Sequence, residues 1–422
     1  MKFIVNGGKK LAGDIDVRGS KNAALPALAA CTLLKRPCAI DNLPLIGDIF
    51  TMIGILKAMG AEVDWLEKRK VRIDCSNLQP DMAPRSLVCK IRASVLLLGP
   101  LLARFGEVKI GTPGGCHIGL RPIDIHLDAF RELGFSVKHS ESKDVYHIWK
   151  EGRGNKKEIA LKGLTVTGTE NLLMYAALHP LRIKIAAIEP SVGDLGRLLE
   201  KMGAKIHGFG SHTLEVKKPV RQSGGVVHHA VVYDPIEAGT FIILAAVTKS
   251  DLRVRNVPIE DLTLTLRKLE EFGVKFEIRG TDVLVKGGVS KLVAVPRLVA
   301  QEYPGIPTDL QAPFCILATQ ARGETLIFDT IYEGRLKYLY ELDKMGASVE
   351  ILDPHRARIK GPKDLVGKNV ESIDLRAGAT LIIAALAAKG ESVLHQAEQI
   401  DRGYENIDEQ LRMVRADIQR VE

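Results

Sequence analysis

Residues 111–121, GTPGGCHIGLR, place a cysteine among glycines and basic side chains. Four glycines and one proline in eleven residues are typical of a surface loop rather than of a helix or a strand. Cys116 lies at the centre of this loop, with His117 and Arg121 close by in the sequence. Cationic neighbours allow a thiol to ionise near neutral pH. The residues alone leave two interpretations open, a reactive thiol and an incidental loop cysteine.

Three charged residues introduce apolar segments, where an ion needs a partner. Lys21 and Asn22 open KNAALPALAA, where helix N–H groups and a cation could hold an anion, although an exposed lysine explains the pattern equally well. Arg92 precedes ASVLLLGPLLA and either meets an anion or extends its charged end to the surface. Asp309, in PGIPTDLQA, is a cap or first-turn carboxylate of a helix, or a carboxylate held in apolar surroundings for chemistry.

Three arginines stand beside glycines in short motifs, YEGR, DLRAG and IDRGYE. They are Arg335, Arg376 and Arg402. Singly, each is typical of a surface arginine. Together, three guanidinium groups directed at one cleft would bind a substrate that carries both a phosphate and a carboxylate.

A pattern of helix, glycine stop and strand recurs about every 70 residues and would position these side chains. Its six copies are LKAMGAEV (56–63), FRELGFSV (130–137), LEKMGAKI (199–206), LEEFGVKF (269–276), LDKMGASV (342–349) and LRMVRADI (411–418). Arg415 takes the place of the glycine in the sixth copy. A helix stop followed by alternating apolar residues predicts a strand after each stop.

A second segment, apolar on all sides, precedes each copy and predicts a buried helix. Examples are AGTFIILAAVT and LRAGATLIIAALAA. Six α/β units of about 70 residues are each too small to close a core alone, so we expect two domains of three units. The polar, glycine-rich stretch at 210–235 marks the boundary between them.

The composition excludes several classes of protein. The chain has 422 residues, 46% of them hydrophobic and 26% charged, which excludes a disordered or collagen-like protein. The net charge of +8 favours anionic partners, but only 5% of the residues are aromatic and the basic residues are scattered, which argues against nucleic-acid binding. Apolar runs are shorter than the roughly 18 residues of a membrane span, and the start of the chain lacks a signal-peptide pattern, so we expect a cytoplasmic protein. The six cysteines show no ligand spacing, and no metal or cofactor is expected.

The order of several segments resembles the enolpyruvyl transferases, and within them the branch that acts on UDP-N-acetylglucosamine. These segments are GSKNAALPALAA, TPGGCHIGLRPIDIH, TGTENLLM, DPIEAGTF, PTDLQAPF, DLRAGATL and IDRGYENI, and the resemblance covers the whole chain. It implies a two-domain inside-out α/β barrel with three βαβαββ units per domain, the helices inside, and a two-stranded hinge over an interdomain cleft. We therefore expect an N-terminal domain at 22–232, with a lid loop at 111–121, and a C-terminal domain made of 1–21 plus 233–422.

The resemblance also implies a reaction. The enolpyruvyl group of phosphoenolpyruvate moves to the 3′-hydroxyl of UDP-N-acetylglucosamine by addition and then elimination, phosphate leaves, and the product starts peptidoglycan precursor synthesis. Such chemistry needs cations for a phosphate and a carboxylate, a base, an acid and a dry site. Phosphoenolpyruvate and UDP-N-acetylglucosamine are the expected partners, with no nucleic acid, no membrane and no obligate protein partner.

Site residues follow from the matching motifs. The resemblance makes Cys116 the acid towards the vinyl carbon and Asp309 the base for the sugar hydroxyl, with Lys21 and Arg402 completing the catalytic set. It assigns phosphoenolpyruvate to Lys21, Asn22 and the arginines, and the uridine diphosphate to 121–125 and 165–166. The full substrate-binding set is Lys21, Asn22, Arg92, Arg121, Pro122, Ile123, Asp124, Ile125, Thr165, Val166, Asp309, Ile331, Arg335, Asp374, Leu375, Arg376 and Arg402.

Three of these positions carry open questions. Asp124 begins DIHLDAFRELG and could cap that helix as well as contact a ligand. Gly163 stands where the family often has a lysine, beside Lys162, which could replace it. Pro235 stands where the family commonly has an arginine, so the hinge or nucleotide contact there is open.

Two other functions compete with this one. The shikimate-pathway enzyme of the same fold, 3-phosphoshikimate 1-carboxyvinyltransferase, lacks the lid cysteine and carries a GNAGTAMR-type segment that this sequence lacks. A catalytically silent relative that binds a sugar nucleotide would have no use for Cys116 or Asp309.

Overall fold

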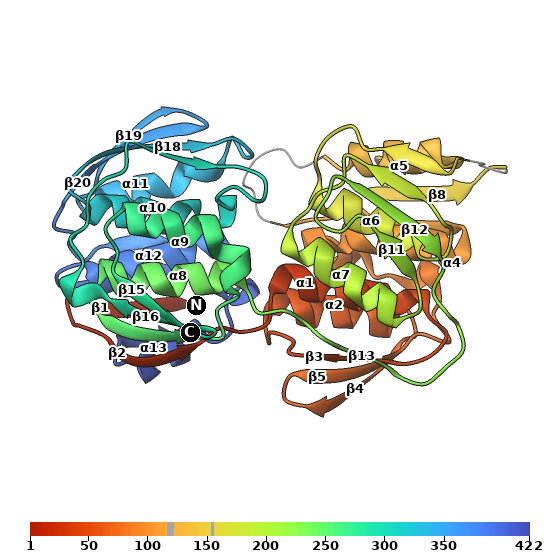
Figure 1. Cartoon of the computed structure of the whole chain (residues 1–422), viewed down its shortest axis with the longest axis horizontal. Coiled ribbons are helices and arrows are strands. Elements are labelled where there is room, and N and C mark those ends of the chain that lie inside the picture. Colours follow the sequence, from red (N-terminus) through yellow and green to blue (C-terminus); the bar gives the residue numbers. More distant parts are fainter. Residues whose placement is uncertain (116–121, 153–155) are drawn as a thin grey trace. The chain divides into compact units, whose positions relative to one another are not determined.

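The computed structural model describes residues 1–115, 122–152 and 156–422 (Figure 1). These residues form two compact units. The C-terminal unit consists of Met1–Arg18 and Tyr233–Glu422, and the N-terminal unit of Gly19–Gly115 and 122–232. The start of the chain therefore folds with its second half.

The elements of the C-terminal unit repeat in one order, strand, helix, strand, helix and two strands. Its strands are β1 (Lys2–Asn6), β2 (Ala12–Asp16), β14 (Asp251–Arg255), β15 (Phe276–Arg279), β16 (Asp282–Lys286), β17 (Arg297–Ala300), β18 (Gly323–Asp329), β19 (Ser348–Asp353), β20 (Arg356–Gly361), β21 (Asn369–Glu371), β22 (Glu391–His395) and β23 (Asp417–Val421). Its helices are α8 (Pro235–Val247), α9 (Thr263–Glu271), α10 (Thr308–Gln320), α11 (Leu339–Lys344), α12 (Leu375–Ala387) and α13 (Ile407–Met413).

Two of the three repeats of the N-terminal unit follow the same order. Within the described residues, the other repeat adds the short helix α3 (Arg85–Val88) and has no leading strand. The strands of the unit are β3 (Cys38–Asp41), β4 (Glu62–Glu67), β5 (Lys70–Asp74), β6 (Glu107–Gly111), β7 (Phe135–Ser140), β8 (Val145–Lys150), β9 (Glu158–Ala160), β10 (Arg182–Lys184), β11 (Lys205–His207), β12 (Thr213–Lys218) and β13 (Val227–Ala230). Its other helices are α1 (Lys21–Ala30), α2 (Gly47–Ala58), α4 (Leu98–Phe105), α5 (Asp124–Glu132), α6 (Val166–Ala176) and α7 (Pro190–Lys201).

Five of the six sheets among the described residues share one mixed pattern, in which the first two strands are parallel and the others antiparallel, and the sixth, β6-β8-β7, is antiparallel throughout. The C-terminal unit has the orders β2-β14-β16-β15, β17-β18-β20-β19 and β21-β22-β1-β23. The N-terminal unit has β13-β3-β5-β4 and β9-β10-β12-β11, and within its described residues the third sheet, β6-β8-β7, has three strands. Three strands come from distant parts of the sequence. β1 lies between β22 and β23, β2 pairs with β14, and β13 pairs with β3. The chain is an α/β protein with mixed sheets.

The helix stops adopt the left-handed conformation that the sequence pattern predicts. The backbone φ is 97° at Gly60, 108° at Gly203 and 92° at Gly346, and the other two glycines of the pattern behave alike. Arg415 adopts the same conformation with φ 70° although it carries a side chain. The sixth copy of the pattern therefore keeps its turn and bears the strain of a non-glycine residue there.

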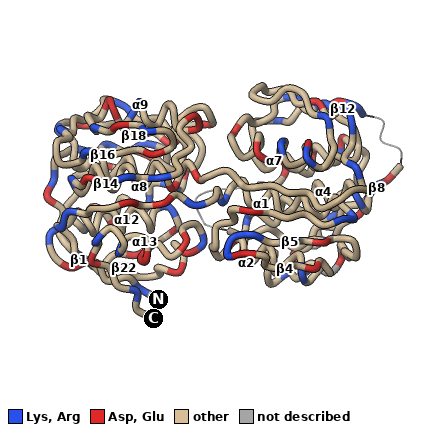
Figure 2. Tube along the Cα trace, turned by 60° about the horizontal axis from the view of Figure 1, so that its bottom comes forward, with Lys and Arg blue, Asp and Glu red and all other residues tan. Residues whose placement is uncertain are grey.

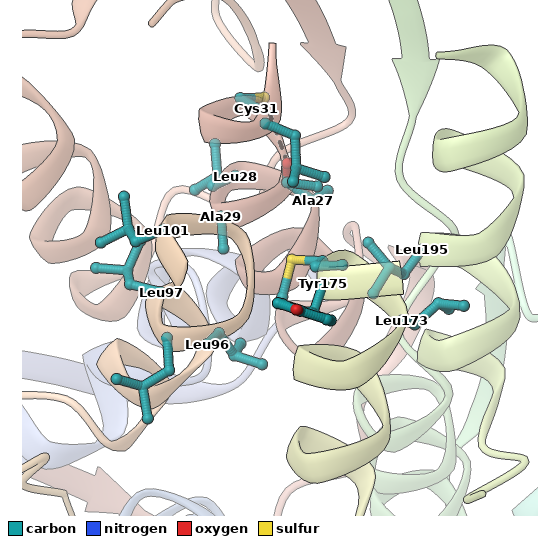
Figure 3. Close-up of a cluster of buried hydrophobic side chains, with 14 of the residues drawn as sticks. Ala27, Leu28, Ala29, Cys31, Leu96, Leu97, Leu101, Leu173, Tyr175 and Leu195 are labelled. Carbon is teal, nitrogen blue, oxygen red and sulfur yellow. Dashed lines mark hydrogen bonds between the residues drawn. The ribbon is translucent and has the colours of Figure 1, made fainter. Parts of the chain in front are cut away.

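The helices expected to be buried are buried. In α8 and α12 the side chains from Ile236 to Val247 and from Leu375 to Leu386 are inaccessible to solvent. In the C-terminal unit α10 packs against both α8 and α12, and these helices lie in its interior (Figure 1). Figure 3 shows the corresponding core of the N-terminal unit, where side chains of α1, α4, α6 and α7 meet. This prediction is confirmed.

Charged residues of both signs are interspersed along the chain in each unit (Figure 2). Among the described residues, no helix combines the length and the apolar character that crossing a bilayer requires. In the same part of the chain, no three His, Cys, Asp or Glu side chains converge as metal ligands would.

Candidate active site

A carboxylate and two buried guanidinium groups meet in the C-terminal unit, and we call them the arginine cluster (Asp309, Arg335 and Arg376). Asp309 lies in the first turn of α10, and Arg335 follows β18. Arg335 Nη2 donates a hydrogen bond of 2.6 Å to Asp309 Oδ1. Burial alone would lower the pKa of Arg335, but the charges of Asp309 and Asp374 outweigh it, and the pKa is raised above its ordinary value. Arg335 is therefore a permanent cation in a buried position.

Arg376, the second residue of α12, approaches the same carboxylate. Its Nε lies 3.5 Å from Asp309 Oδ2, and its Nη2 lies 3.8 Å from Asp234 Oδ2. The guanidinium carbon is 5.0 Å from the centre of the Tyr404 ring. Burial opposes the charge, but Tyr404 and the two aspartates raise the pKa of Arg376 above its ordinary value. Its Nε and Nη1 are buried and have no hydrogen-bond partner among the described residues.

These contacts correct one expectation for Asp309. Its nearest partners are two guanidinium groups, so the prediction of apolar surroundings was wrong. The N-cap of α10 is Pro307, and Asp309 is a first-turn carboxylate rather than the cap. The sequence placed Arg335 and Arg376 in separate motifs and gave no sign that both would contact this carboxylate.

The interior helices of the C-terminal unit begin at one place. Asp234 caps α8 by accepting from the N–H groups of Ile236 (2.8 Å) and Glu237 (3.3 Å). Asp374 caps α12 in the same way, accepting from the N–H groups of residues 376 (2.8 Å) and 377 (3.0 Å). Pro235 occupies the first position of α8, where its missing N–H costs no hydrogen bond. Capping thus gives Asp234 and Asp374 structural roles that fix the helix starts beside the cluster.

A further aspartate, which the sequence analysis missed, orders the segment before Arg335. Asp329, fully buried at the end of β18, accepts from the N–H groups of Ile331 (2.9 Å) and Tyr332 (3.0 Å). Its second oxygen accepts a hydrogen bond from Thr308, the neighbour of Asp309. Ile331 is half-buried in this turn, and Leu375 is buried at the start of α12.

Arg402 ends the 3₁₀ segment Ala397–Arg402 and is half-buried. Its Nη1 lies 3.4 Å from Gln399 Oε1. Arg420 fixes the neighbouring Asp401 of this segment by donating two hydrogen bonds to it (2.6 and 2.9 Å), and it also donates to Asp408.

In the N-terminal unit, Lys21 is half-buried and forms an ion pair with a buried aspartate. Its Nζ lies 2.8 Å from Asp48 Oδ2, and 12% and 5% of the two side chains are exposed. Ser20 caps α1 by accepting from the N–H of Ala23 at 3.4 Å. The exposed-lysine interpretation was therefore wrong, while Asn22 beside it is exposed. Asp48 had no signal in the sequence that would have linked it to Lys21.

The segment 122–125 lies next to Arg92. The Nη2 of Arg92, a half-buried residue, donates to the carbonyl of Pro122 at 3.1 Å. Pro122 and Asp124 are exposed, Ile123 is buried and Ile125 is half-buried. The N-cap of α5 is Ile123, without a side-chain hydrogen bond, so Asp124 is not the cap of that helix. The capping interpretation of Asp124 was wrong.

Thr165 and Val166 begin α6. Thr165 is its N-cap and accepts from the N–H of Gly168 at 3.2 Å. Gly163 lies beside Ile125 with space for a Cβ at ordinary contact distance. Lys162 Nζ lies 2.7 Å from Asp128 Oδ2, so it already has an anionic partner on α5.

Two expected site residues, Cys116 and Arg121, lie outside the described residues together with the rest of 116–121. The acid and phosphate-binding roles implied for them stay predictions. Among the remaining candidates, the contacts above join Asp309, Arg335 and Arg376 in the C-terminal unit, and Arg92 with Pro122 in the N-terminal unit.

Comparisons with known proteins agree on one family. The family model described as EPSP synthase (3-phosphoshikimate 1-carboxyvinyltransferase) matches residues 5–411. The chain is 41% identical, over all of its length and 96% of the relative's, to UDP-N-acetylglucosamine 1-carboxyvinyltransferase of Coxiella burnetii (strain Dugway 5J108-111). It is 42% identical, with the same coverage, to the enzyme of that name in Koribacter versatilis (strain Ellin345).

A solved structure shows the same fold. The enolpyruvyl transferase NikO from Streptomyces tendae superimposes with a TM-score of 0.89 at 23% sequence identity, covering 99% of this chain and 98% of that one. EPSP synthase from Acinetobacter baumannii gives a TM-score of 0.76 at 17% identity over the whole of both chains.

Proposed function

The chain belongs to the EPSP synthase family of enolpyruvyl transferases, and from this membership we propose that it is a UDP-N-acetylglucosamine 1-carboxyvinyltransferase. It transfers the enolpyruvyl group of phosphoenolpyruvate to the 3′-hydroxyl of UDP-N-acetylglucosamine and releases phosphate, as a step of peptidoglycan precursor synthesis. Full-length relatives at 41–42% identity that bear this enzyme's name support the choice of acceptor.

The arginine cluster is the observation that carries the proposal. Arg335 and Arg376 are buried cations, and Arg376 keeps buried N–H groups without a hydrogen-bond partner among the described residues. Buried donors of this kind are costly unless a ligand accepts their hydrogen bonds. A planar guanidinium pair matches the oxygens of a phosphate or carboxylate, and phosphoenolpyruvate carries both. We assign Arg335, Arg376 and Arg402 to this substrate, with Lys21 and Asn22 of the N-terminal unit.

The same contacts suggest how Asp309 becomes available as the base. Without substrate, its carboxylate is held by Arg335 at 2.6 Å and approached by Arg376 at 3.5 Å. An anionic substrate competes for these guanidinium groups and weakens their hold on Asp309. A carboxylate relieved of a cation binds a proton more readily, which a base for the sugar hydroxyl requires. Binding of phosphoenolpyruvate thus prepares proton removal.

The nucleotide is assigned to the helix starts of the N-terminal unit. We assign it to three segments, which are residues 121–125 (Arg121, Pro122, Ile123, Asp124 and Ile125), Thr165 with Val166, and the one that carries Arg92. Helix N-termini favour negative charge, which suits a diphosphate. Lys162 is engaged by Asp128, so we do not assign it the contact that a lysine at position 163 would make. Ile331, Asp374 and Leu375 complete the proposed substrate set, and Cys116 donates the proton to the vinyl carbon.

We further propose the inside-out α/β barrel of the family for each domain, with the N-terminal domain at 22–232 and the C-terminal domain at 1–21 plus 233–422. The buried helices α8, α10 and α12, and the recurring strand order around them, support this architecture. We also propose that the enzyme is cytoplasmic and that it needs no metal, no other cofactor and no protein partner.

A phosphate-release assay tests the function. The purified chain is incubated with phosphoenolpyruvate and either UDP-N-acetylglucosamine or shikimate 3-phosphate. Phosphate release with only the first acceptor supports the proposal. Release with only shikimate 3-phosphate would favour the activity named in the family model, and release with neither would favour a silent sugar-nucleotide-binding relative.

A further inference from the structure

Three polar side chains of the N-terminal unit, two of them buried and one half-buried, form a network that the proposed reaction does not use directly. They are His126 on α5 and Thr167 and Asn171 on α6, and we call them the histidine network. His126 and Asn171 are only 4% and 1% exposed. Buried polar groups need partners, so their hydrogen bonds define the arrangement.

Asn171 has all its hydrogen-bonding groups engaged. Its Oδ1 accepts from the N–H of Gly99 at 2.6 Å, and its Nδ2 donates to the carbonyl of Val95 at 2.9 Å. The remaining amide hydrogen points to His126 Nδ1, 3.0 Å away. The amide orientation is fixed because Gly99 offers only a donor and Val95 only an acceptor. Asn171 therefore donates to His126, and Nδ1 must accept.

This bonding determines the state of the imidazole. With Nδ1 as acceptor, the single proton of a neutral ring is on Nε2, which lies 3.2 Å from Thr167 Oγ1 and donates to it. Burial, and after it the charge of Arg92, lowers the pKa of His126 to about 3. The ring is therefore neutral at physiological pH and holds one fixed tautomer.

The network connects three pieces of chain. His126 directly follows the segment 122–125, and Thr167 directly follows Thr165 and Val166. Asn171 ties both to the chain after Arg92, at Val95 and Gly99. The backbones approach so closely that a Cβ on Gly99 would lie 2.1 Å from the carbonyl oxygen of Asn171. The three segments are thus held in one fixed arrangement.

We propose that His126, Thr167 and Asn171 are positioning residues for the sugar nucleotide, because they lock the two segments assigned to the uridine diphosphate against the one that carries Arg92. This inference rests on the proposed function. A binding surface made of three separate segments gains affinity when the segments are ordered before the ligand arrives, since the ordering cost is then met in folding. The network supplies this order without contacting the nucleotide.

The test removes the hydroxyl of Thr167 and keeps the shape of the side chain. Thr167→Val loses the acceptor of His126 Nε2, whereas Thr167→Ser retains it. The matched control is Thr248→Val in the C-terminal unit, where a buried hydroxyl bonded to the Leu244 carbonyl and to Ser250 is lost far along the chain from the network. For each variant, KM for both substrates, kcat, the calorimetric Kd for UDP-N-acetylglucosamine alone and the melting temperature are measured.

Loss of one partly buried hydrogen bond that orders a binding segment should raise KM and Kd for UDP-N-acetylglucosamine about fivefold to tenfold in Thr167→Val. KM for phosphoenolpyruvate and kcat should change less than about twofold, and Thr167→Ser should restore the nucleotide affinity. The control should melt lower by a similar amount and bind the nucleotide normally.

An unchanged Kd in Thr167→Val, or an equal loss in all kinetic constants, would overturn the positioning role while the wild type remains active. A wild type inactive with UDP-N-acetylglucosamine would instead overturn the proposed function, so the two failures are distinct.

Discussion

Replacing Asp309 by Asn should destabilise the C-terminal unit as well as stop the reaction. Asp309 contacts two guanidinium groups whose side chains are 5% and 3% exposed. Removing one partner from a buried ion pair costs about 3–5 kcal/mol, because the other charge stays buried. Asp309 is 26% exposed and Arg376 keeps Asp234 at 3.8 Å, so we expect a cost just below this range, about 2–3 kcal/mol.

Differential scanning calorimetry measures this loss, and the matched control is Asp282→Asn. Asp282 pairs with Arg253 on the neighbouring strands β14 and β16, where the arginine side chain is 49% exposed. An exposed pair contributes at most about 1 kcal/mol. For a unit of this size, Asp309→Asn should lower the melting temperature by roughly 5–10 °C and the control by no more than about 3 °C.

Activity and stability together decide the role of Asp309. Loss of a general base should lower kcat by about 100-fold or more, while Asp282→Asn keeps wild-type turnover. If Asp309→Asn melts like the wild type, the two arginines do not depend on this carboxylate and the reasoning from the cluster fails. If it melts lower but retains its kcat, Asp309 is structural and another group is the base.

Four further predictions concern Cys116, Glu170, Arg415 and the absence of a metal requirement. Iodoacetamide and fosfomycin should label Cys116 first, because four of the other thiols are buried, and peptide mapping that finds the label elsewhere would contradict this. Cys116→Ser should then lose most activity and Cys116→Asp keep it. Burial raises the pKa of Glu170 to about 8 against the hydrogen bond from Ser191, so the folded chain holds a proton that the unfolded chain releases above its ordinary 4.5, and stability falls as the pH rises from 4.5 to 8. Glu170→Gln should therefore raise the free energy of unfolding by about 5 kcal/mol at pH 9 and little at pH 5, as measured by urea titration. An equal effect at both pH values would refute the assignment. Arg415→Gly should stabilise by about 0.5–1 kcal/mol by relieving the positive φ, and a loss of stability would show that the side chain matters more. Dialysis against a chelator should leave turnover unchanged, and activity restored only by a divalent ion would show that a metal is needed.

Local patterns made much of the fold predictable. The glycine stops and all-round apolar helices are local in sequence, and the structure places a left-handed residue at each stop and buries each apolar helix. Arg415 breaks the glycine pattern and still adopts the left-handed conformation, so the five glycine copies were enough to predict the sixth turn. The strand exchanges of β1, β2 and β13 leave no local trace, since each strand pairs with partners far along the chain.

The candidate site was predictable only as a set of residue types. Motifs pointed to Lys21, Arg335 and Arg376, but their partners lie more than 20 residues away, and those of Arg376 belong to other repeats. Pairing between charges so far apart depends on how helices and strands pack, which no spacing rule expresses. The surroundings of Asp309 were mistaken for this reason, because the apolar residues that follow it in sequence face the core while its carboxylate faces two arginines.

The repeat itself explains where the chemistry must lie. Beyond their first turns the interior helices are buried, and a polar side chain there is costly without a partner such as those of Asn171. At their first turns the free N–H groups and the helix dipole favour anions. In the C-terminal unit the contacts among Asp234, Asp309 and Arg376 show that the starts of α8, α10 and α12 meet. In the N-terminal unit the histidine network joins the start of α6 to the chain around α4 and α5. We therefore expect a protein of six such units to offer anionic substrates its helix starts. Of the assigned residues, Lys21, Val166, Asp309 and Arg376 lie in the first turns of α1, α6, α10 and α12, and Arg92 lies in the chain leading into α4.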